Sequence, residues 1–458
     1  MPRARADNRR PRSTRLHPAD ARAYWMASKI PSDQFLLYCF DSGSEGLDAE
    51  VPRLHERSER IEVLRRRITD VAFGLDYPRW TEACPRPDTI SVHRTPRTWP
   101  ECLDAIAASF ARQVDPRVSV WHLHLYPNIA DAPGGAAVVA VLQLSHAAAD
   151  GTLAARTARD LFGTHPLPPA SARAEPPAVF VQASTIVAAA TVPLRLAQMV
   201  HGGVRARRDA LSLGRGTDSG EIPPPAHSRA PTALDVPPAG RTAVRTIVLP
   251  KSDLQSAGTT VTTVTTFVLT AVSVALQRLL GDGPDLAAEV TLARDTRADA
   301  RNNFGNVGVG LFTDEPDIRT RSRLVSADLA ARRARANHPL SEAARASQDA
   351  VEAHVPAFLA EWGVAQFDPT AVPPSVTGNT VVSSVSRGAA DLTFGGGSVR
   401  FTAGFPALSP AMSLTHGVHG IGDTVTVGIT SNSAAVPDPD LYEALLRDAL
   451  ADVRTALA

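Results

Sequence analysis

Apolar runs and amphipathic stretches alternate along the whole chain. Residues 136–144 (AAVVAVLQL) form a nearly unbroken, valine-rich apolar run, which predicts a buried strand. Just beyond it, Leu153, Thr157 and Leu161 recur every fourth residue and predict an amphipathic helix. Further strands are predicted at 35–40, 118–125, 245–249, 290–293, 380–385 and 425–429, and further helices at 54–68, 103–110, 179–207, 264–279, 321–362 and after Asp438. This mixture predicts the α/β class.

The same pattern predicts two domains. Residues 212–241 are rich in glycine, proline, serine and alanine, and are predicted to be an extended interdomain crossover. Residues 21–211 and 242–458 then form two α/β domains around a shared cleft. Residues 1–20 begin with an arginine-rich segment and are predicted to be a basic, disordered tail.

Composition narrows the class of protein. The chain has 458 residues, 44% of them hydrophobic and 21% charged, as expected of a globular protein with a sizeable core. The formal net charge is zero, which argues against a nucleic-acid partner. No run reaches the ~20 apolar residues of a membrane span, and no secretory signal is recognised. We therefore expect a cytoplasmic protein, with any lipid contact confined to its surface through the arginine-rich tail.

Cysteine usage agrees with that location. Cys39, Cys84 and Cys102 are widely separated and odd in number, so they form neither a metal-ligand spacing nor a disulfide framework. Buried free thiols are the expected interpretation, ahead of a catalytic cysteine. Lys29 and Lys251 are the chain's two lysines, and the arginine bias indicates a high-GC bacterial genome.

The candidate chemistry lies where the strand 136–144 ends. Ser145 and His146 follow the apolar run, and Asp150 and Gly151 come one helical turn later. A neutral imidazole in this position can act as a general base, the carboxylate can orient the loop, and the glycine permits a tight turn. The alternative is a buried, hydrogen-bonded histidine with Asp150 capping the next helix.

Two other patterns are assigned structural roles. His122 and His124 lie on one face of the predicted strand, opposite Leu123 and Leu125. Solvated or hydrogen-bonded histidines are favoured over a metal cluster, because no carboxylate or cysteine completes a ligand set. No metal site is predicted. The three glycines 395–397 predict a hairpin turn and not a phosphate loop, because no lysine follows them.

The motif resembles the His-x-x-x-Asp-Gly core of a superfamily of acyl-thioester acyltransferases. This superfamily includes chloramphenicol acetyltransferase and the condensation domains of peptide synthetases. Among its members, the chain is most similar to the wax ester synthase/diacylglycerol acyltransferase family. The similar stretches occur in the family's order: Pro31 to Leu36 (PSDQFL), Trp121, the motif itself, Arg297 with Gly305-Asn306, and Thr380 to Val385 (TVVSSV).

The chain departs from that family at three places. The family usually carries two adjacent histidines, of which the first is Ser145 here. An Asn-Asp pair that opens a helix in the family appears as Thr265-Thr266, and Ser384 stands where the family has asparagine.

The resemblance implies two chloramphenicol-acetyltransferase-like α/β sandwich domains with a tunnel between them. It implies that His146 is the general base and Asp150 a structural carboxylate, paired with Arg297 across the domain interface. Gly151, Ser145, Ser383 and Ser384 are the candidates for oxyanion stabilisation, and Asn306 for holding a loop of the second domain.

The implied reaction is transfer of an acyl group from an acyl thioester, such as acyl-CoA, to a hydroxyl or amine acceptor. It requires no cofactor beyond the thioester substrate. Two alternatives stay open: a condensation-like natural-product enzyme whose substrates ride on an acyl carrier protein, and a non-catalytic relative that binds a ligand in the same cleft.

Overall fold

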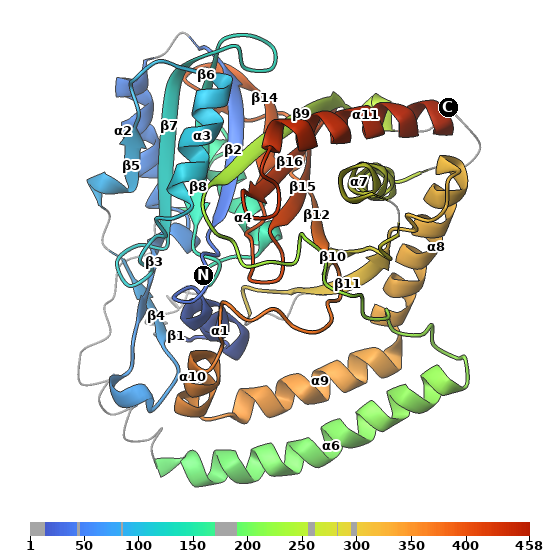
Figure 1. Cartoon of the computed structure of the whole chain (residues 1–458). Helices are drawn as coiled ribbons and strands as arrows, with labels where there is room; N and C mark the ends of the chain where they lie inside the picture. Colours follow the sequence, from blue (N-terminus) through green and yellow to red (C-terminus); the bar gives the residue numbers. More distant parts are fainter. Residues whose placement is uncertain are drawn as a thin grey trace, which may run out of the picture.

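The computed structural model describes residues 14–43, 46–83, 86–169, 190–254, 262–281, 283–294 and 300–458. It contains two large mixed sheets, each built mainly from one half of the chain, with helices on their outer faces, and a small three-stranded sheet (Figure 1). The predicted α/β class is confirmed.

The N-terminal sheet is built on three long strands, β2 (Gln34–Asp41), β8 (Ala137–Leu144) and β7 (Trp121–Ala130), which pair antiparallel. Short strands β5 (Ile90–Val92) and β6 (Arg97–Thr98) extend it beside β7. The buried run predicted at 136–144 is β8, in the middle of the sheet. Helices α2 (Leu47–Ser58), α3 (Trp99–Ser109) and α4 (Gly151–Phe162) belong to this half.

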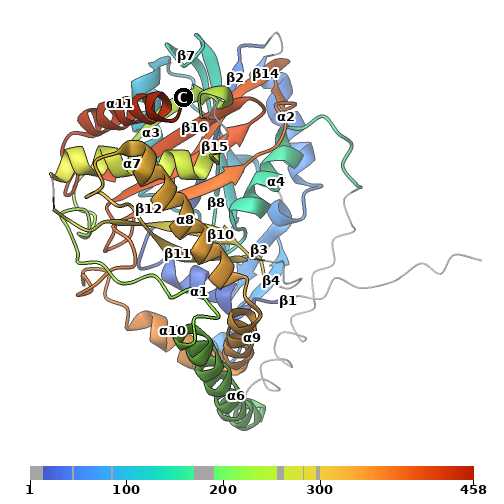
Figure 2. The same cartoon turned by 90° about the vertical axis from the view of Figure 1, so that its right-hand side faces the viewer.

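The C-terminal sheet has six strands in the order β11-β10-β12-β15-β16-β9. These strands are β9 (Thr242–Pro250), β10 (Ala287–Ala293), β11 (Phe304–Gly310), β12 (Thr380–Ser386), β15 (Leu414–Ile421) and β16 (Thr424–Asn432). Helices α7 (Val264–Leu280), α8 (Ile318–Ala336) and α11 (Pro439–Leu457) lie on one side of this sheet (Figures 1 and 2). The predicted cap of the last helix is confirmed, because the Asp438 carboxylate accepts the amide of Leu441 at 3.0 Å.

One strand crosses between the halves. The hairpin of β13 (Thr393–Phe394) and β14 (Gly397–Gly404) comes from the C-terminal half, but β14 pairs antiparallel with β2. The predicted domain 242–458 is therefore not a separate unit, because its β14 satisfies the open edge of the N-terminal sheet. The turn Gly395–Gly396 has positive φ at both residues, as the predicted hairpin requires.

The two sheets approach closely where β14 ends. A Cβ on Gly417 of β15 would lie 2.2 Å from the carbonyl oxygen of Gly404, and one on Gly428 of β16 would lie 2.6 Å from it. Glycine at these positions lets the strand of one sheet rest directly on the backbone of the other.

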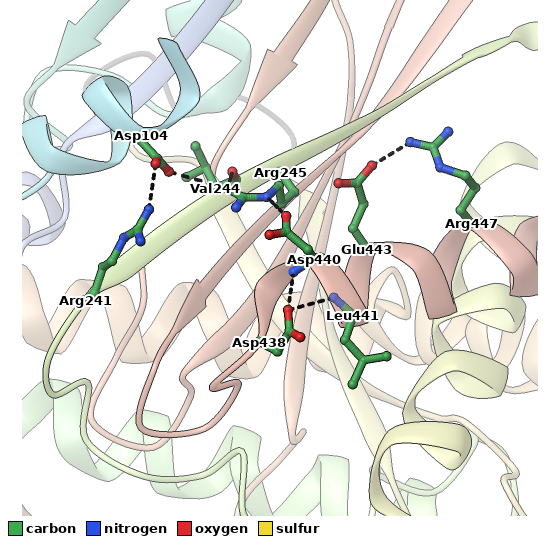
Figure 3. A network of polar contacts seen from close by, with 9 residues as sticks. All are labelled: Asp104, Arg241, Val244, Arg245, Asp438, Asp440, Leu441, Glu443 and Arg447. Atoms are coloured by element: carbon green, nitrogen blue, oxygen red, sulfur yellow. Dashed lines mark hydrogen bonds and ion pairs between the residues drawn. The ribbon is translucent and has the colours of Figure 1, made fainter. Parts of the chain in front are cut away.

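Charged residues join the halves at the edge strand β9 (Figure 3). Asp104 of α3 accepts from Arg241 at 2.7 Å and lies 3.6 Å from Arg245 of β9. The Arg245 guanidinium also pairs with Asp440 at the start of α11. The inner face of α3 packs in an apolar cluster with β2, β7, β8, β14 and β9, so these ion pairs border a buried contact.

Three predicted boundaries are wrong. Residues 14–20, assigned to the disordered tail, include β1 (Thr14–Arg15), which pairs with β4 (Arg79–Glu82), and the start of α1 (Pro18–Met26). The helix predicted at 54–68 is α2 followed by strand β3 (Arg66–Thr69). The crossover predicted at 212–241 begins later, because α6 (Val192–Asp218) continues as a helix and lies along α9 (Pro339–His354) (Figure 2).

Local chemistry explains why a helix begins inside the segment that was predicted to be disordered. The Pro18 ring and the His17 side chain, which accepts the Ala19 amide, start α1 in a segment whose composition indicated disorder. Short helix α10 (Ala357–Ala365) follows α9 and lies against α1 (Figure 1). No helix in the described ranges is long and apolar enough to cross a membrane.

Candidate active site

The motif loop links β8 to α4 at the junction of the two halves. His146 lines a cavity of about 710 Å³ whose walls come from both halves of the chain. On the N-terminal side lie β2 and the first two turns of α4, and on the C-terminal side lie β12 and the loop before β11. The histidine predicted to be the base therefore faces a space large enough for a small organic substrate.

Asp150 connects the motif loop both to α4 and to the C-terminal half of the chain. Its Oδ1 accepts the amide of Leu153 at 2.9 Å, which caps α4, and its Oδ2 accepts the amide of Asn303 at 3.1 Å. Its own amide donates to the carbonyl of Arg301 at 3.0 Å. Asp150 thus contacts the other half of the chain through the backbone of residues 301–303. The expected partner Arg297 lies outside the described residues.

A second carboxylate supports this contact from behind. Asp20 of α1 is fully buried and accepts the amides of Arg301 and Asn302 at 3.1 Å each. The Asn302 side chain donates to Asp20 Oδ1 at 2.9 Å and to the carbonyl of His146, also at 2.9 Å. On the other side, Gln34 of β2 donates to the carbonyl of Ala149. The motif loop is therefore fixed at both ends before any ligand binds.

The surroundings of His146 favour its neutral form. Burial lowers the pKa of this imidazole below its usual range, and the backbone hydrogen bond at His146, the Asn302 contact and the Asp150 charge oppose that effect only in part. The ring of Phe304 lies 5.6 Å from the imidazole, centroid to centroid, and forms an apolar wall. A neutral imidazole at neutral pH can accept a proton.

The structure brings most of the other predicted residues to the same cavity. Its lining includes Gly151, Asn306, Ser383 and Ser384. Asn306 donates to Glu289 of β10 at 3.0 Å, as a residue that holds the second-domain loop would. Ser145 does not line the cavity, because it is buried at the end of β8.

Thr265 connects a further family landmark to the cavity. Its hydroxyl donates to that of Ser384 at 3.3 Å, while Thr263 caps α7 by accepting the amide of Thr266 at 3.2 Å. The Thr265-Thr266 pair therefore stands beside the candidate oxyanion residues.

His122, His124, Cys39 and Cys102 have structural surroundings in the part of the chain that the structure describes. His122 bonds to Ser91 at 2.9 Å and His124 to Gln143 at 3.0 Å, so both are hydrogen-bonded as predicted. Within the described ranges no cluster of His, Cys, Asp or Glu could hold a metal. Burial raises the pKa of Cys39 and of Cys102 to about 12, which makes either thiol a poor nucleophile. Cys84 lies outside the described residues.

Four functional candidates were not predicted from the sequence: Asp20, Asn302, Arg387 and His419. Asp20 contacts Asn302, 282 residues away, and Asn302 contacts His146, 156 residues away; no local pattern indicates either contact. Arg387 and His419 line the cavity although each is less than a tenth exposed. For Arg387 the available signal was its position two residues after the predicted strand 380–385, because site residues concentrate at strand ends.

Comparison with known proteins gives a consistent picture. Residues 301–454 match the family model of the WS/DGAT C-terminal domain. The wax ester synthase/diacylglycerol acyltransferase from Marinobacter aquaeolei VT8 has a similar structure, with a TM-score of 0.61 and 17% identity over 97% of this chain and 100% of that one. Comparison with curated protein sequences gives no significant match.

Condensation domains are similar over the same length. The first condensation domain of the calcium-dependent antibiotic synthetase, in complex with a substrate analogue, gives a TM-score of 0.57 at 15% identity, covering 98% of this chain and 97% of that one. A starter condensation domain of rhizomide synthetase, in complex with C8-CoA and Leu-SNAC, gives 0.55 at 14% identity, covering 97% and 94%.

These likenesses define the class: the chain has the two-domain, chloramphenicol-acetyltransferase-like fold of condensation domains and related acyltransferases. Within this class, residues 301–454 are also similar to the WS/DGAT family, because they match that family's C-terminal domain model. The resemblance predicted from the sequence is confirmed.

Proposed function

We propose that this protein transfers an acyl group from an acyl thioester to a hydroxyl or amine acceptor, with His146 as the general base. The observation that carries the proposal is the position of His146. An imidazole with a lowered pKa faces a cavity shared by both halves, on a loop that Asp150, Asn302 and Gln34 fix.

The reaction follows from that position. His146 removes the proton from the acceptor as its oxygen or nitrogen attacks the thioester carbonyl, forming a tetrahedral oxyanion. The oxyanion collapses, the carbon–sulfur bond breaks, and the imidazolium returns its proton to the leaving thiolate. Ser383, Ser384 and Gly151 line the cavity. We propose the two hydroxyls, or a backbone amide near Gly151, as donors to the oxyanion. Asp150 acts as a positioning residue.

The missing first histidine of the motif does not weaken this assignment. Position 145 is buried, and its side chain is absent from the cavity wall. Serine in place of histidine at position 145 changes the packing behind the loop, and His146 still faces the cavity.

A neighbouring cavity supports CoA as the donor. This space of about 800 Å³ shares Ala293 and Asn306 with the first cavity. Four arginines line it against one glutamate, Glu342: Arg294, Arg332, Arg335 and Arg345. Arg332 is paired with Asp328, and Arg335 donates to the Thr217 hydroxyl and the Pro223 carbonyl. A wall with this many guanidinium groups suits the phosphates of a nucleotide thioester.

The test is acceptor-dependent thiol release from a panel of acyl-CoAs with alcohols and amines, by wild type and by His146→Ala. We expect release by wild type and a loss of about 10³-fold in kcat in the folded variant. His201→Ala, on the exposed face of α6, is the matched control. Release that survives in His146→Ala would remove this residue as the base.

The alternatives have their own outcomes. If acyl-CoAs are silent and acyl-carrier-protein donors react, the condensation-like function replaces the CoA-dependent one. If both donor classes are silent while acyl-CoA still binds, the protein is a ligand-binding relative.

A further inference from the structure

Arg387 is a buried cation on the wall of the catalytic cavity. It directly follows β12, and only 4% of its surface is exposed. Among the residues that the structure describes, no aspartate or glutamate contributes to its electrostatic surroundings. A buried charge without a counter-ion is strongly unfavourable, so its presence calls for an explanation.

The contacts of Arg387 leave part of its hydrogen-bonding capacity unused. Nη1 donates to Thr402 Oγ1 of β14 at 2.7 Å, and the guanidinium carbon lies 5.3 Å from the centroid of the Tyr38 ring. Nε is buried and has no partner in the described structure. Neither a hydroxyl nor an aromatic ring neutralises the charge, so the guanidinium has no counter-ion among the described residues.

His419 of β15 lies beside Arg387 on the same wall. It is 6% exposed, and its Nδ1 also has no partner within the described ranges. Burial and the neighbouring guanidinium lower the pKa of His419 well below its usual range. The ring is therefore neutral and can donate one N–H without adding a second charge.

Gly404 allows the two side chains to converge. A Cβ at this position would lie 2.7 Å from Arg387 Nη2 and 2.8 Å from His419 Nε2. Only glycine leaves room for both nitrogens against the end of β14, and all three residues line the cavity.

The nearest cation on α4 is already neutralised. Arg159 pairs with Asp391, and its Nη1 donates to the carbonyls of Arg387 at 3.0 Å and Ala389 at 2.9 Å. These bonds anchor the backbone of Arg387 beside α4.

Arg159 is eight residues beyond Gly151, or about 12 Å along the helix. Arg387 is three residues beyond Ser384, on the order of 10 Å along the strand.

We propose that Arg387 and His419 form a subsite for the carboxylate of the acceptor substrate, so that the acceptor is a hydroxy- or amino-carboxylic acid. This inference rests on the proposed acyl transfer and names the substrate class of that site. A carboxylate matches the planar fork of the guanidinium and brings a single charge to a single cation. The separation from the motif leaves room for a carbon chain between the carboxylate and the attacking oxygen or nitrogen.

The experiment compares ω-hydroxycarboxylates with 1-alkanols of equal length as acceptors, with octanoyl-CoA as donor. Wild type is expected to prefer the hydroxycarboxylates by about 10- to 100-fold in kcat/KM, and Arg387→Met to lose most of that preference. Arg387→Lys, which keeps the charge but loses the fork, is expected to fall between them. Arg86→Met removes an exposed arginine and is the control, with the wild-type preference retained.

Two further measurements separate this inference from the proposed function. Calorimetric titration of ω-hydroxyoctanoate into His146→Ala requires no turnover; binding there, weakened at least tenfold when Arg387→Met is added, would support the subsite even if catalysis failed. The thermal midpoint of Arg387→Met is expected to equal or exceed that of wild type, because an uncompensated buried charge is removed.

Three results would overturn the subsite. The first is an unchanged preference in Arg387→Met. The second is a variant that loses affinity for CoA and not for ω-hydroxyoctanoate, which would assign the guanidinium to a donor phosphate. The third is a midpoint lowered by more than about 10 °C or failure to fold, which would give Arg387 a structural role.

Discussion

The side-chain nitrogen of Asn302 lies 2.9 Å from Asp20 Oδ1 and 2.9 Å from the carbonyl oxygen of His146. One amide thus connects the first helix of the chain, the loop before β11 and the candidate base. The backbone amide of Asn302 also donates to Asp20, so the carboxylate fixes the position of this residue. The orientation of His146 depends on a residue far from the motif in sequence.

Replacement of Asn302 by alanine is therefore expected to lower activity more than stability. The variant keeps both backbone bonds to Asp20 but leaves the His146 carbonyl without its donor, and we expect kcat to fall by roughly 10- to 100-fold. Asn302→Asp is expected to be worse, because a second carboxylate would face Asp20 and the carbonyl. Thiol-release kinetics and thermal melts of both variants check this. Equal activity in wild type and Asn302→Ala would contradict it.

The pH dependence of kcat/KM should report the titration of His146. Since burial lowers the pKa of this imidazole, its base form is populated throughout the neutral range. We expect kcat/KM to be constant above about pH 7 and to fall tenfold per pH unit below an apparent pKa under 6.5. A profile measured with saturating and limiting acceptor checks this. An acidic limb centred above that value would mean that another group titrates.

Asp150→Asn should weaken the joint between the two halves. The asparagine oxygen can still cap α4 at Leu153, but its amide group would place a donor against the amide of Asn303, where Oδ2 now accepts. We expect a loss of about 1–3 kcal/mol in the free energy of unfolding, and more for Asp150→Ala, which also removes the cap. Urea denaturation measures the difference. Asp438→Ala, which removes the cap of α11 alone, is the control for a simple capping effect.

The centre of the site could be predicted from the sequence, but its supports could not. His146 and Asp150 stand between an apolar strand and an amphipathic helix, so local periodicity located both residues. Asp20 lay in a segment whose arginine content indicated disorder, and its donors come from residues 301–302. The crossing of β14 to β2 is equally non-local, because a strand's own pattern specifies which face is buried but not which sheet edge it joins.

Asp33, which lines the same cavity as His146, offers a stability test that needs no measurement of turnover. Burial raises the pKa of this carboxyl to about 6, although Val114 and Gln143 both donate to its Oδ2. The unfolded chain ionises more readily, so this group favours the folded state below about pH 4, and that contribution is lost as the pH rises through 6. Asp33→Asn keeps an acceptor for both donors and carries no charge. We expect it to stabilise the protein at pH 8 by up to about 3 kcal/mol, and to have little effect at pH 4. Urea denaturation at both values measures the difference, and an equal effect at the two would show that ionisation of Asp33 is not its cause.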